Sequence, residues 1–248
     1  DADIGSYLIY YLFPKEKVFS DNRFGDAYSS NFWDHVYLPA FADETVWQAL
    51  LKERNFNVIY LYQYDNGAGV RQFMYNRMSD PEWAFVYGDP FSIIFVRNTP
   101  ENQDIISKFR ITPENAFEKL DFLRKSESED SVVAAADILN LLNRVDLSRD
   151  IFLDVVTKRP ENGKIWMIMG EWELAINAKE HSLLAMMYLH KAIDVGQETS
   201  EAYSFLGLAY YRVGRTKEAL QFLQKSLDLN PDRQDAIRLI SAIYNENK

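Results

Sequence analysis

The sequence predicts a two-domain α+β/α protein, in which a small α/β layer of about four strands forms a mixed sheet and precedes an all-α superhelix. Two observations carry this prediction. In residues 1–103, short runs rich in β-branched and aromatic residues alternate with stretches of helical periodicity. In residues 129–248, small and large apolar residues recur at fixed spacing, and Pro160 and Pro231 each close one of the repeated segments.

Composition limits the possible functions. The chain has 248 residues, of which 47% are hydrophobic and 15% aromatic, which is enough for well-packed cores. Its net charge of −10 argues against nucleic-acid binding, because a phosphate backbone needs a basic stripe. The absence of cysteine excludes disulfides and cysteine catalysis. No apolar run reaches the roughly 18 to 20 residues that a membrane span requires.

Residues 200–231 carry the clearest pattern, whose members are Tyr203, Leu206, Gly207, Tyr210, Ala219, Leu223 and Pro231. Small side chains at Gly207 and Ala219 let two antiparallel helices approach closely, and Pro231 ends the second helix because it has no amide proton to donate. The spacing resembles the 34-residue tetratricopeptide repeat (TPR), with Tyr203 at its Trp position. The sequence therefore predicts a TPR superhelix.

One helix pair cannot bury its apolar faces alone, so the pattern predicts neighbouring repeats. Counting back from Pro231 places three repeats at 129–162, 163–199 and 200–233, followed by a capping helix at 234–246. The middle repeat has a turn near residues 178–182 that is about three residues longer than the pattern requires. Residues 104–128 are predicted to form a linker and a connecting helix, the helix running from about Thr112 to Lys125.

The N-terminal elements follow from local patterns. Residues 4–13 predict a helix stopped by Pro14, and residues 17–20 a strand. Two helices come next, one from Ser30 or Asn31 to Leu38 and one capped by Asp43. Residues 56–62, apolar on both faces, predict a buried strand that would pair in parallel with the first through a right-handed crossover.

The rest of this domain is a helix and a hairpin. Residues 70–78 predict the helix, and residues 83–87 and 91–97 predict two strands that turn at Gly88-Asp89-Pro90. The domain ends near residue 103.

Residues 4–103 resemble the soluble segment that follows the last transmembrane helix in bacterial membrane proteins of the GT-C glycosyltransferase type, the dolichyl-phosphate-mannose mannosyltransferase-like group. The residues that carry the resemblance are Gly5-Ser6-Tyr7-Leu8, Pro14, Val18-Phe19, Asp21, Arg23, Trp83, Val86-Tyr87 and Phe95-Val96-Arg97. Ser6 departs from the second Gly of that group. The resemblance implies an extracytoplasmic position, periplasmic or at the cell surface, behind a polytopic membrane region. Catalytic carboxylates of that group lie in the membrane region, so none is assigned here.

Two places in the first domain are candidate sites. Asp21, Arg23 and Asp26 follow the first predicted strand, where open α/β sheets form crevices, although an Arg between two carboxylates is also a common structural ion pair. Residues 64–70 connect a strand to a helix and could receive a phosphate or be a plain loop.

No catalytic constellation is visible. His35, His181 and His190 are far apart, which predicts no metal site, and the sequence has no nucleophile elbow, P-loop or zinc-protease motif. We therefore expect the chain to be non-enzymatic and to use no cofactor.

The remaining candidate is the concave face that the first helices of the repeats would build. Its predicted members are Asp137, Asn140, Lys164, Met167, Glu171, Glu201, Ser204, Leu208, Tyr211 and Arg212. TPR proteins that bind chaperone tails carry Lys, Asn and Arg at fixed positions, which here hold Val133, Asp137, Ile168, Glu201 and Phe205. That carboxylate clamp is absent. The mixed, somewhat acidic groove that remains would bind a protein or peptide, or serve as a rigid spacer or self-association surface.

The sequence thus supports three functional hypotheses. The first is a non-catalytic extracytoplasmic portion of a membrane glycosyltransferase-like protein, whose TPRs mediate protein contacts. The second is a freestanding TPR adaptor or scaffold with an N-terminal α/β module. The third is an α/β domain that binds a sugar or lipid-linked donor, with the TPRs as support.

If the first hypothesis holds, the full-length protein should have several apolar stretches of about 20 residues before Asp1, with Lys and Arg favouring the loops on the opposite side of the membrane. The sequence of the complete gene tests whether these apolar stretches exist. A cysteine introduced at Ser128 and probed with a membrane-impermeant thiol reagent tests the topology. A gene without such spans would leave the adaptor, and labelling only after lysis would reverse the predicted side.

Overall fold

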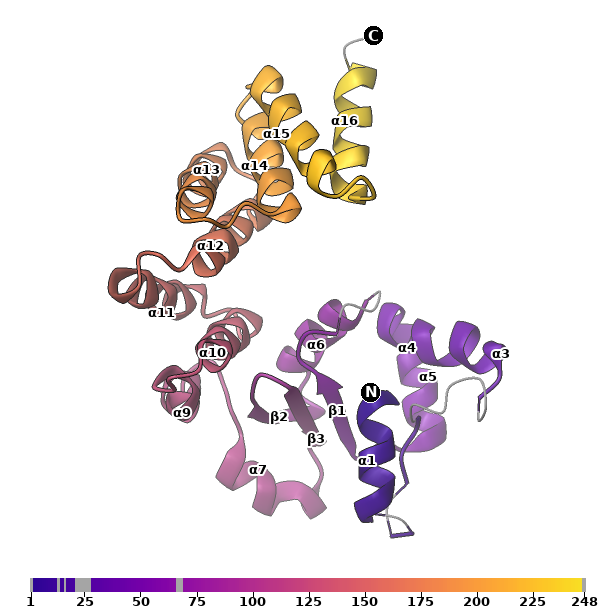
Figure 1. The fold of residues 1–248 in the computed structure, drawn as a ribbon. Coiled ribbons are helices and arrows are strands. Elements are labelled where there is room, and N and C mark those ends of the chain that lie inside the picture. Colours follow the sequence, from indigo (N-terminus) through magenta and orange to yellow (C-terminus); the bar gives the residue numbers. More distant parts are fainter. Residues whose placement is uncertain (1, 13, 16, 21–27, 66–68, 247–248) are drawn as a thin grey trace. The chain divides into compact units, whose positions relative to one another are not determined.

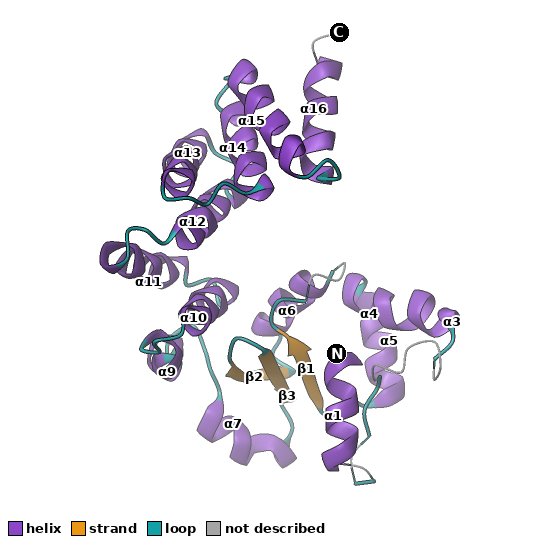
Figure 2. Ribbon diagram, in the orientation of Figure 1, coloured by secondary structure: helices purple, strands orange, loops and turns teal. Residues whose placement is uncertain are grey.

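The computed structural model describes residues 2–12, 14–15, 17–20, 28–65 and 69–246 (Figure 1). It is mostly helical, with one small sheet (Figure 2). The chain divides into two compact units, Asp1–Ser148 and Arg149–Lys248, and the division falls within helix α11 (Val145–Lys158). Each unit has its own packed interior, and we describe each by itself.

The sheet of the first unit is antiparallel and three-stranded, in the order β1-β3-β2. Its strands are β1 (Val58–Tyr62), β2 (Trp83–Gly88) and β3 (Ser92–Arg97). The predicted hairpin is confirmed, and Asp89 closes its turn by accepting hydrogen bonds from the amides of Phe91 and Ser92 at 2.8 and 2.7 Å. The predicted strand at 56–62 is present as β1.

The predictions of a parallel crossover and of a fourth strand were wrong. Residues 17–20 form no strand, and β1 pairs antiparallel with β3, with Ile59 opposite Phe95. As an edge strand, β1 buries Ile59 and Leu61 but leaves Val58 51% exposed, so only one face is covered. Apolar side chains on both faces therefore do not require a parallel strand, because β-branched and aromatic residues also occupy the open face of an edge strand.

Helices surround this sheet. They are α1 (Ala2–Leu12), α3 (Ser30–Phe32), α4 (Leu38–Ala42), α5 (Glu44–Arg54) and α6 (Val70–Ser79), with a π-helical turn at Trp33–Tyr37. Asp43 caps α5 as predicted, accepting from the amide of Thr45 at 2.8 Å. The helix that begins after Ser29 does not stop before Pro39, because the π turn places this proline in the first turn of α4, where its missing amide proton costs no hydrogen bond.

Residues 100–148 complete the first unit. A 3-10 turn (Pro100–Asn102) leads into α7 (Gln103–Phe109), and two short helices, α8 (Ala116–Lys119) and α9 (Asp121–Arg124), replace the single helix predicted there. Helix α10 (Glu129–Leu141) then packs on the sheet. A Cβ atom on Gly88 of β2 would lie 2.6 Å from Ile138 Cδ1, and Gln63 Nε2 donates to the Ala134 carbonyl at 3.3 Å. The predicted first helix of the first repeat thus packs as part of the first unit.

The second unit consists of the remainder of α11 and of five helices, α12 (Gly163–Ala175), α13 (Lys179–Asp194), α14 (Ser200–Arg212), α15 (Thr216–Leu229) and α16 (Gln234–Glu246). Figure 1 shows α14 and α15 side by side, and α12 and α13 pack in the same way. Both α11 and α15 end just before the turns that contain Pro160 and Pro231, as the pattern predicts.

The two helix pairs share one close contact. A Cβ atom on Gly207 of α14 would lie 2.6 Å from Leu223 Cγ of α15, and one on Gly170 of α12 would lie 2.6 Å from Leu189 Cγ of α13. Real Cβ atoms do not approach so closely, so a larger residue at either position forces the leucine side chain or a helix to shift. Glycine costs a helix about 0.5 to 1 kcal/mol relative to alanine, and the close packing of a buried leucine offsets this cost.

The extra residues of the middle repeat do not lengthen its turn. The turns of both pairs have equal length, at residues 176–178 and 213–215. Instead α13 begins six residues before Ala185, whereas α15 begins three residues before the equivalent Ala219. The added turn of α13 is stabilised because His181 Nδ1 lies 2.6 Å from Glu173 Oε2.

We predict that Gly207→Leu destabilises the protein by about 1 to 3 kcal/mol or more, because overpacking separates α14 from α15. The free energy of unfolding, measured by chemical denaturation, tests this. Lys217→Leu is the control, since it adds the same side chain at an exposed position of α15 and should change stability by no more than about 0.5 kcal/mol. Equal midpoints for the wild type and Gly207→Leu would contradict the close contact.

Candidate functional site

The predicted interaction residues of the second unit lie on the first helices of its pairs. Lys164, Met167 and Glu171 recur along one face of α12, and Glu201, Ser204, Leu208, Tyr211 and Arg212 along one face of α14. We call these eight residues the first-helix face. Lys164 and Glu171 are exposed, Met167 and Ser204 are buried, and the other four are half-buried. The face therefore combines a solvated charged rim with less accessible polar and apolar groups.

The part of this face on α14 is fixed by a charged network with the start of α16. Ser204 Oγ donates to Asp235 Oδ2 at 2.8 Å, and Arg233 Nε donates to Asp235 Oδ1 at 2.6 Å. The same guanidinium lies 3.4 Å from Glu201 Oε1 and 5.9 Å from the centroid of the Phe205 ring. Two predicted residues, Glu201 and Ser204, are thus oriented by Arg233 and Asp235.

The predicted site did not include Arg233 and Asp235. Asp235 follows Glu201 by 34 residues, the length of one repeat, so it occupies on α16 the position that Glu201 has on α14. Extending the predicted face into the last helix would have found it.

Asp235 has a pKa below its ordinary value. Burial of the carboxyl raises the pKa, but hydrogen bonds from Arg233 and Ser204, together with the positive charge of Arg233, outweigh this effect. The folded protein therefore favours the ionised form of Asp235 more than the unfolded chain does.

Between these charges the face is apolar. Phe205, Leu208 and Tyr211 are half-buried side chains that pack against the core of the second unit. Arg212 borders them, and its guanidinium donates to the Leu174 carbonyl at the end of α12. Such a surface can cover apolar side chains of a partner while its charged groups set the orientation.

A second charged cluster lies inside the middle repeat. Glu173 of α12 is 4% exposed, and its two carboxylate oxygens lie 2.6 Å from Arg149 of α11 and 2.6 Å from His181 of α13. The corresponding residue of the next repeat is Tyr210, whose hydroxyl lies 2.8 Å from His190 Nε2. Each polar group is paired with its neighbours, so neither cluster leaves the named groups without a partner between the helices.

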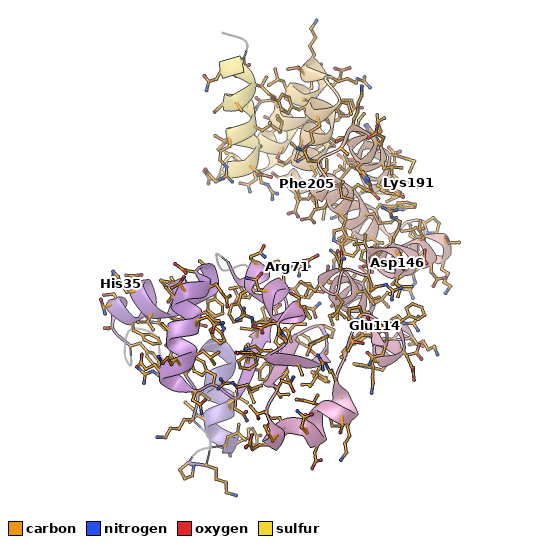
Figure 3. The ribbon with its side chains drawn as sticks, turned by 180° about the vertical axis from the view of Figure 1, so that it is seen from behind. His35, Arg71, Glu114, Asp146, Lys191 and Phe205 are labelled. Atoms are coloured by element: carbon orange, nitrogen blue, oxygen red, sulfur yellow. The ribbon has the colours of Figure 1, made fainter. Side chains whose placement is uncertain are left out.

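The two remaining predicted residues, Asp137 and Asn140, belong to the first unit. Asp137 is 8% exposed, and Arg71 of α6, labelled in Figure 3, lies 3.7 Å from its carboxylate. Burial raises the pKa of Asp137, although Arg71 and a hydrogen bond with Tyr64 act in the opposite direction. The Tyr75 hydroxyl donates to the Asn140 carbonyl at 3.1 Å. Both positions are therefore engaged by residues near α6.

Asp21, Arg23 and Asp26 lie outside the described residues, as do residues 66–68 of the loop before α6. His35 belongs to the first unit, and His181 and His190 are two and a half turns apart on α13. Among the residues whose placement is described, no group of three His, Asp or Glu side chains could hold a metal ion.

Comparison with known proteins confirms one part of the sequence analysis. The family model of the tetratricopeptide repeat matches residues 200–233. Residues 200–233 are a tetratricopeptide repeat. The α14–α15 pair is this repeat, and the α12–α13 pair has the same Gly–Leu contact.

Two solved structures are similar to part of the chain. A structure titled "MamA MSR-1 C2" has 18% sequence identity and a TM-score of 0.43, and the match covers 54% of this chain and 78% of that chain. A structure titled "MamA RS-1 ArsTM double mutant" has 20% identity and a TM-score of 0.41, with coverages of 58% and 89%. No curated protein matches the sequence.

The lowered pKa of Asp235 predicts a pH dependence. A depressed folded-state pKa contributes stability above the unfolded value of about 3.9, and this contribution is lost as the pH falls through the folded pKa. We expect the free energy of unfolding to fall more steeply below about pH 4 in the wild type than in Asp235→Asn. Urea denaturation between pH 2.5 and pH 7 measures both curves. Asp232→Asn, at an exposed neighbouring site, should follow the wild type; parallel curves for wild type and Asp235→Asn would contradict the prediction.

Proposed function

We propose that the second unit binds a protein partner through its first-helix face. The observation that carries this proposal is the match of residues 200–233 to the tetratricopeptide repeat, because stacked helix repeats present extended surfaces on which other proteins bind. The contacts of α14 support it. Arg233 and Asp235 hold Glu201 and Ser204 in place, which reduces the entropy that binding would otherwise cost.

The chemistry of the face indicates the kind of partner. Leu208 and Tyr211 offer half-buried apolar surface. Glu171 and Glu201 add carboxylates beside it, Lys164 and Arg212 add positive charges, and the chain as a whole has a net charge of −10. A segment that carries a large apolar residue flanked by Lys or Arg would complement this combination. The proposed ligand is therefore a basic, partly apolar segment of another protein.

The wider setting follows the sequence analysis. We propose that the chain is non-catalytic and that it belongs to an extracytoplasmic part of a membrane glycosyltransferase-like protein, as the resemblance of residues 4–103 implies. A freestanding TPR scaffold agrees equally well with the repeat. Within the described part of the chain, no helix is both long enough and apolar enough to cross a membrane.

A site-specific photo-cross-linker tests the proposed face. Benzoylphenylalanine at Leu208 should give a discrete adduct with a second protein in the source cells, whereas the same group at Gln221, exposed on α15, should not. Equal adducts from both positions, or none from Leu208, would count against the face.

Affinity measurements with the identified partner complete this test. Leu208→Glu should raise the dissociation constant about tenfold or more, because it places a charge on the apolar surface. Lys164→Glu should lower the dissociation constant, because it replaces a positive charge that repels the basic segment, and Gln221→Glu should leave it unchanged. Lys164 is exposed, so its variant remains informative if Leu208→Glu lowers the stability of the protein.

A further inference from the structure

Helix α16 repeats the packing residues of α14 at a spacing of 34 residues. On its inner side, Ala236 and Ile243 correspond to Ala202 and Ala209, and all four are buried to 1% exposure or less. On its other side, Ile237, Ser241 and Tyr244 correspond to Tyr203, Gly207 and Tyr210. Helix α16 thus has the residue pattern of the first helix of a repeat.

In the complete repeats, the second helix of the pair covers these other positions. The rings of Tyr203 and Tyr210 lie 6.3 and 5.0 Å from that of Phe222 on α15, and the Gly207 backbone approaches Leu223. In the middle repeat, Trp166 stacks on Tyr188 of α13 at 5.8 Å, and the Gly170 backbone approaches Leu189. The same face is therefore covered in the same manner twice within this chain.

On α16 the corresponding face is open. Tyr244 is 59% exposed, Ile237 is 36% exposed and Ser241 is also exposed. Helix α16 is the last helix that the structure describes (Figure 1). We call Ile237, Ser241 and Tyr244 the α16 outer face. Within the described residues, it continues the series of helix-pair interfaces without a second helix packed against it.

We propose that the α16 outer face binds an amphipathic α-helix of a partner protein, which takes the position that α15 has against α14. The covering helices define the chemistry of this partner. Each presents an alanine and, four residues later, a leucine directly preceded by an aromatic residue, as Ala219, Phe222 and Leu223 on α15 and Ala185, Tyr188 and Leu189 on α13 show. Ser241 is the small residue over which the leucine would pack. This surface is separate from the first-helix face.

Binding of a model helix tests the proposal directly. The probe is a fluorescein-labelled peptide of residues 214–231, which contains the whole of α15, added to the 248-residue chain and followed by fluorescence anisotropy. Ser241→Arg fills the space above the small residue and should weaken binding at least about tenfold. Ala242→Arg, at the next exposed position, should not weaken binding. A peptide that carries Leu223→Glu should fail to bind the wild-type chain. Binding that Ser241→Arg leaves unchanged would overturn the proposal.

A second measurement avoids the cost of folding an isolated peptide, since short helices are marginal in water. The same 18 residues are joined to the C-terminus through a flexible Gly/Ser linker. We expect the thermal midpoint to rise and Ser241→Arg to abolish the rise; no rise in the wild type would overturn the proposal. Sedimentation of the unextended chain tests whether a second copy of the chain occupies this face. Dimers that Ser241→Arg abolishes would assign the face to a second copy instead of a partner helix. Loss of binding at the first-helix face would leave these results unaffected.

Discussion

The second unit depends on the approach of a helical backbone to a leucine of the next helix. At Gly170 and Gly207 no side chain separates the two helices, and Leu189 and Leu223 fill the space that a Cβ atom would occupy. This contact fixes the spacing within each pair. Because each pair then exposes another apolar side, the next helix must cover it, and the packing extends from α12 to α16.

This arrangement also decides where function can reside. Residues on the inner sides of the pairs are committed to packing, as Ala202, Leu206 and Ala209 show with 0% exposure. The first-helix face and the α16 outer face both keep apolar side chains at least partly accessible within an ordered frame. The buried charges of the unit, such as Glu173, have partners on neighbouring helices and so contribute to register, a role that buried polar groups have in other helical assemblies.

The repeat could be predicted from sequence because its physics is local. Small residues and a closing proline at fixed spacing are compatible with few structures other than a helix pair. The Asp43 cap and the hairpin turn at Gly88-Asp89-Pro90 were predictable for the same reason, because each depends on neighbouring residues alone. Strand pairing was not predictable in this way. The apolar pattern of residues 56–62 does not distinguish a parallel central strand from an antiparallel edge strand, since the partner strand lies more than thirty residues away. Likewise, the three extra residues of the middle repeat fit a longer turn as well as a longer α13.

The candidate site shows the same limit. The repeat spacing predicted that Ser204 and Glu201 lie on one face. Arg233 and Asp235 belong to the site only because the start of α16 contacts α14 in the folded structure. The position of α10 also depends on such contacts. Its alanine-rich pattern suits a first repeat helix, yet Ile138 packs on Gly88 of the sheet, and Asp137 is enclosed near Arg71. Pattern alone could not reveal that the first unit supplies a surface for this helix.

A double-mutant cycle at Gly207 and Leu223 tests the central contact most directly. Gly207→Ala should be destabilising because its Cβ atom meets Leu223, and Leu223→Ala should be destabilising because it leaves a cavity. Truncated Leu223 provides room for the new methyl group, so the double variant should be more stable than the sum of the single effects predicts, by about 1 kcal/mol or more. Additivity within about 0.5 kcal/mol would show that the two residues do not meet, and would contradict the packing on which this structure depends.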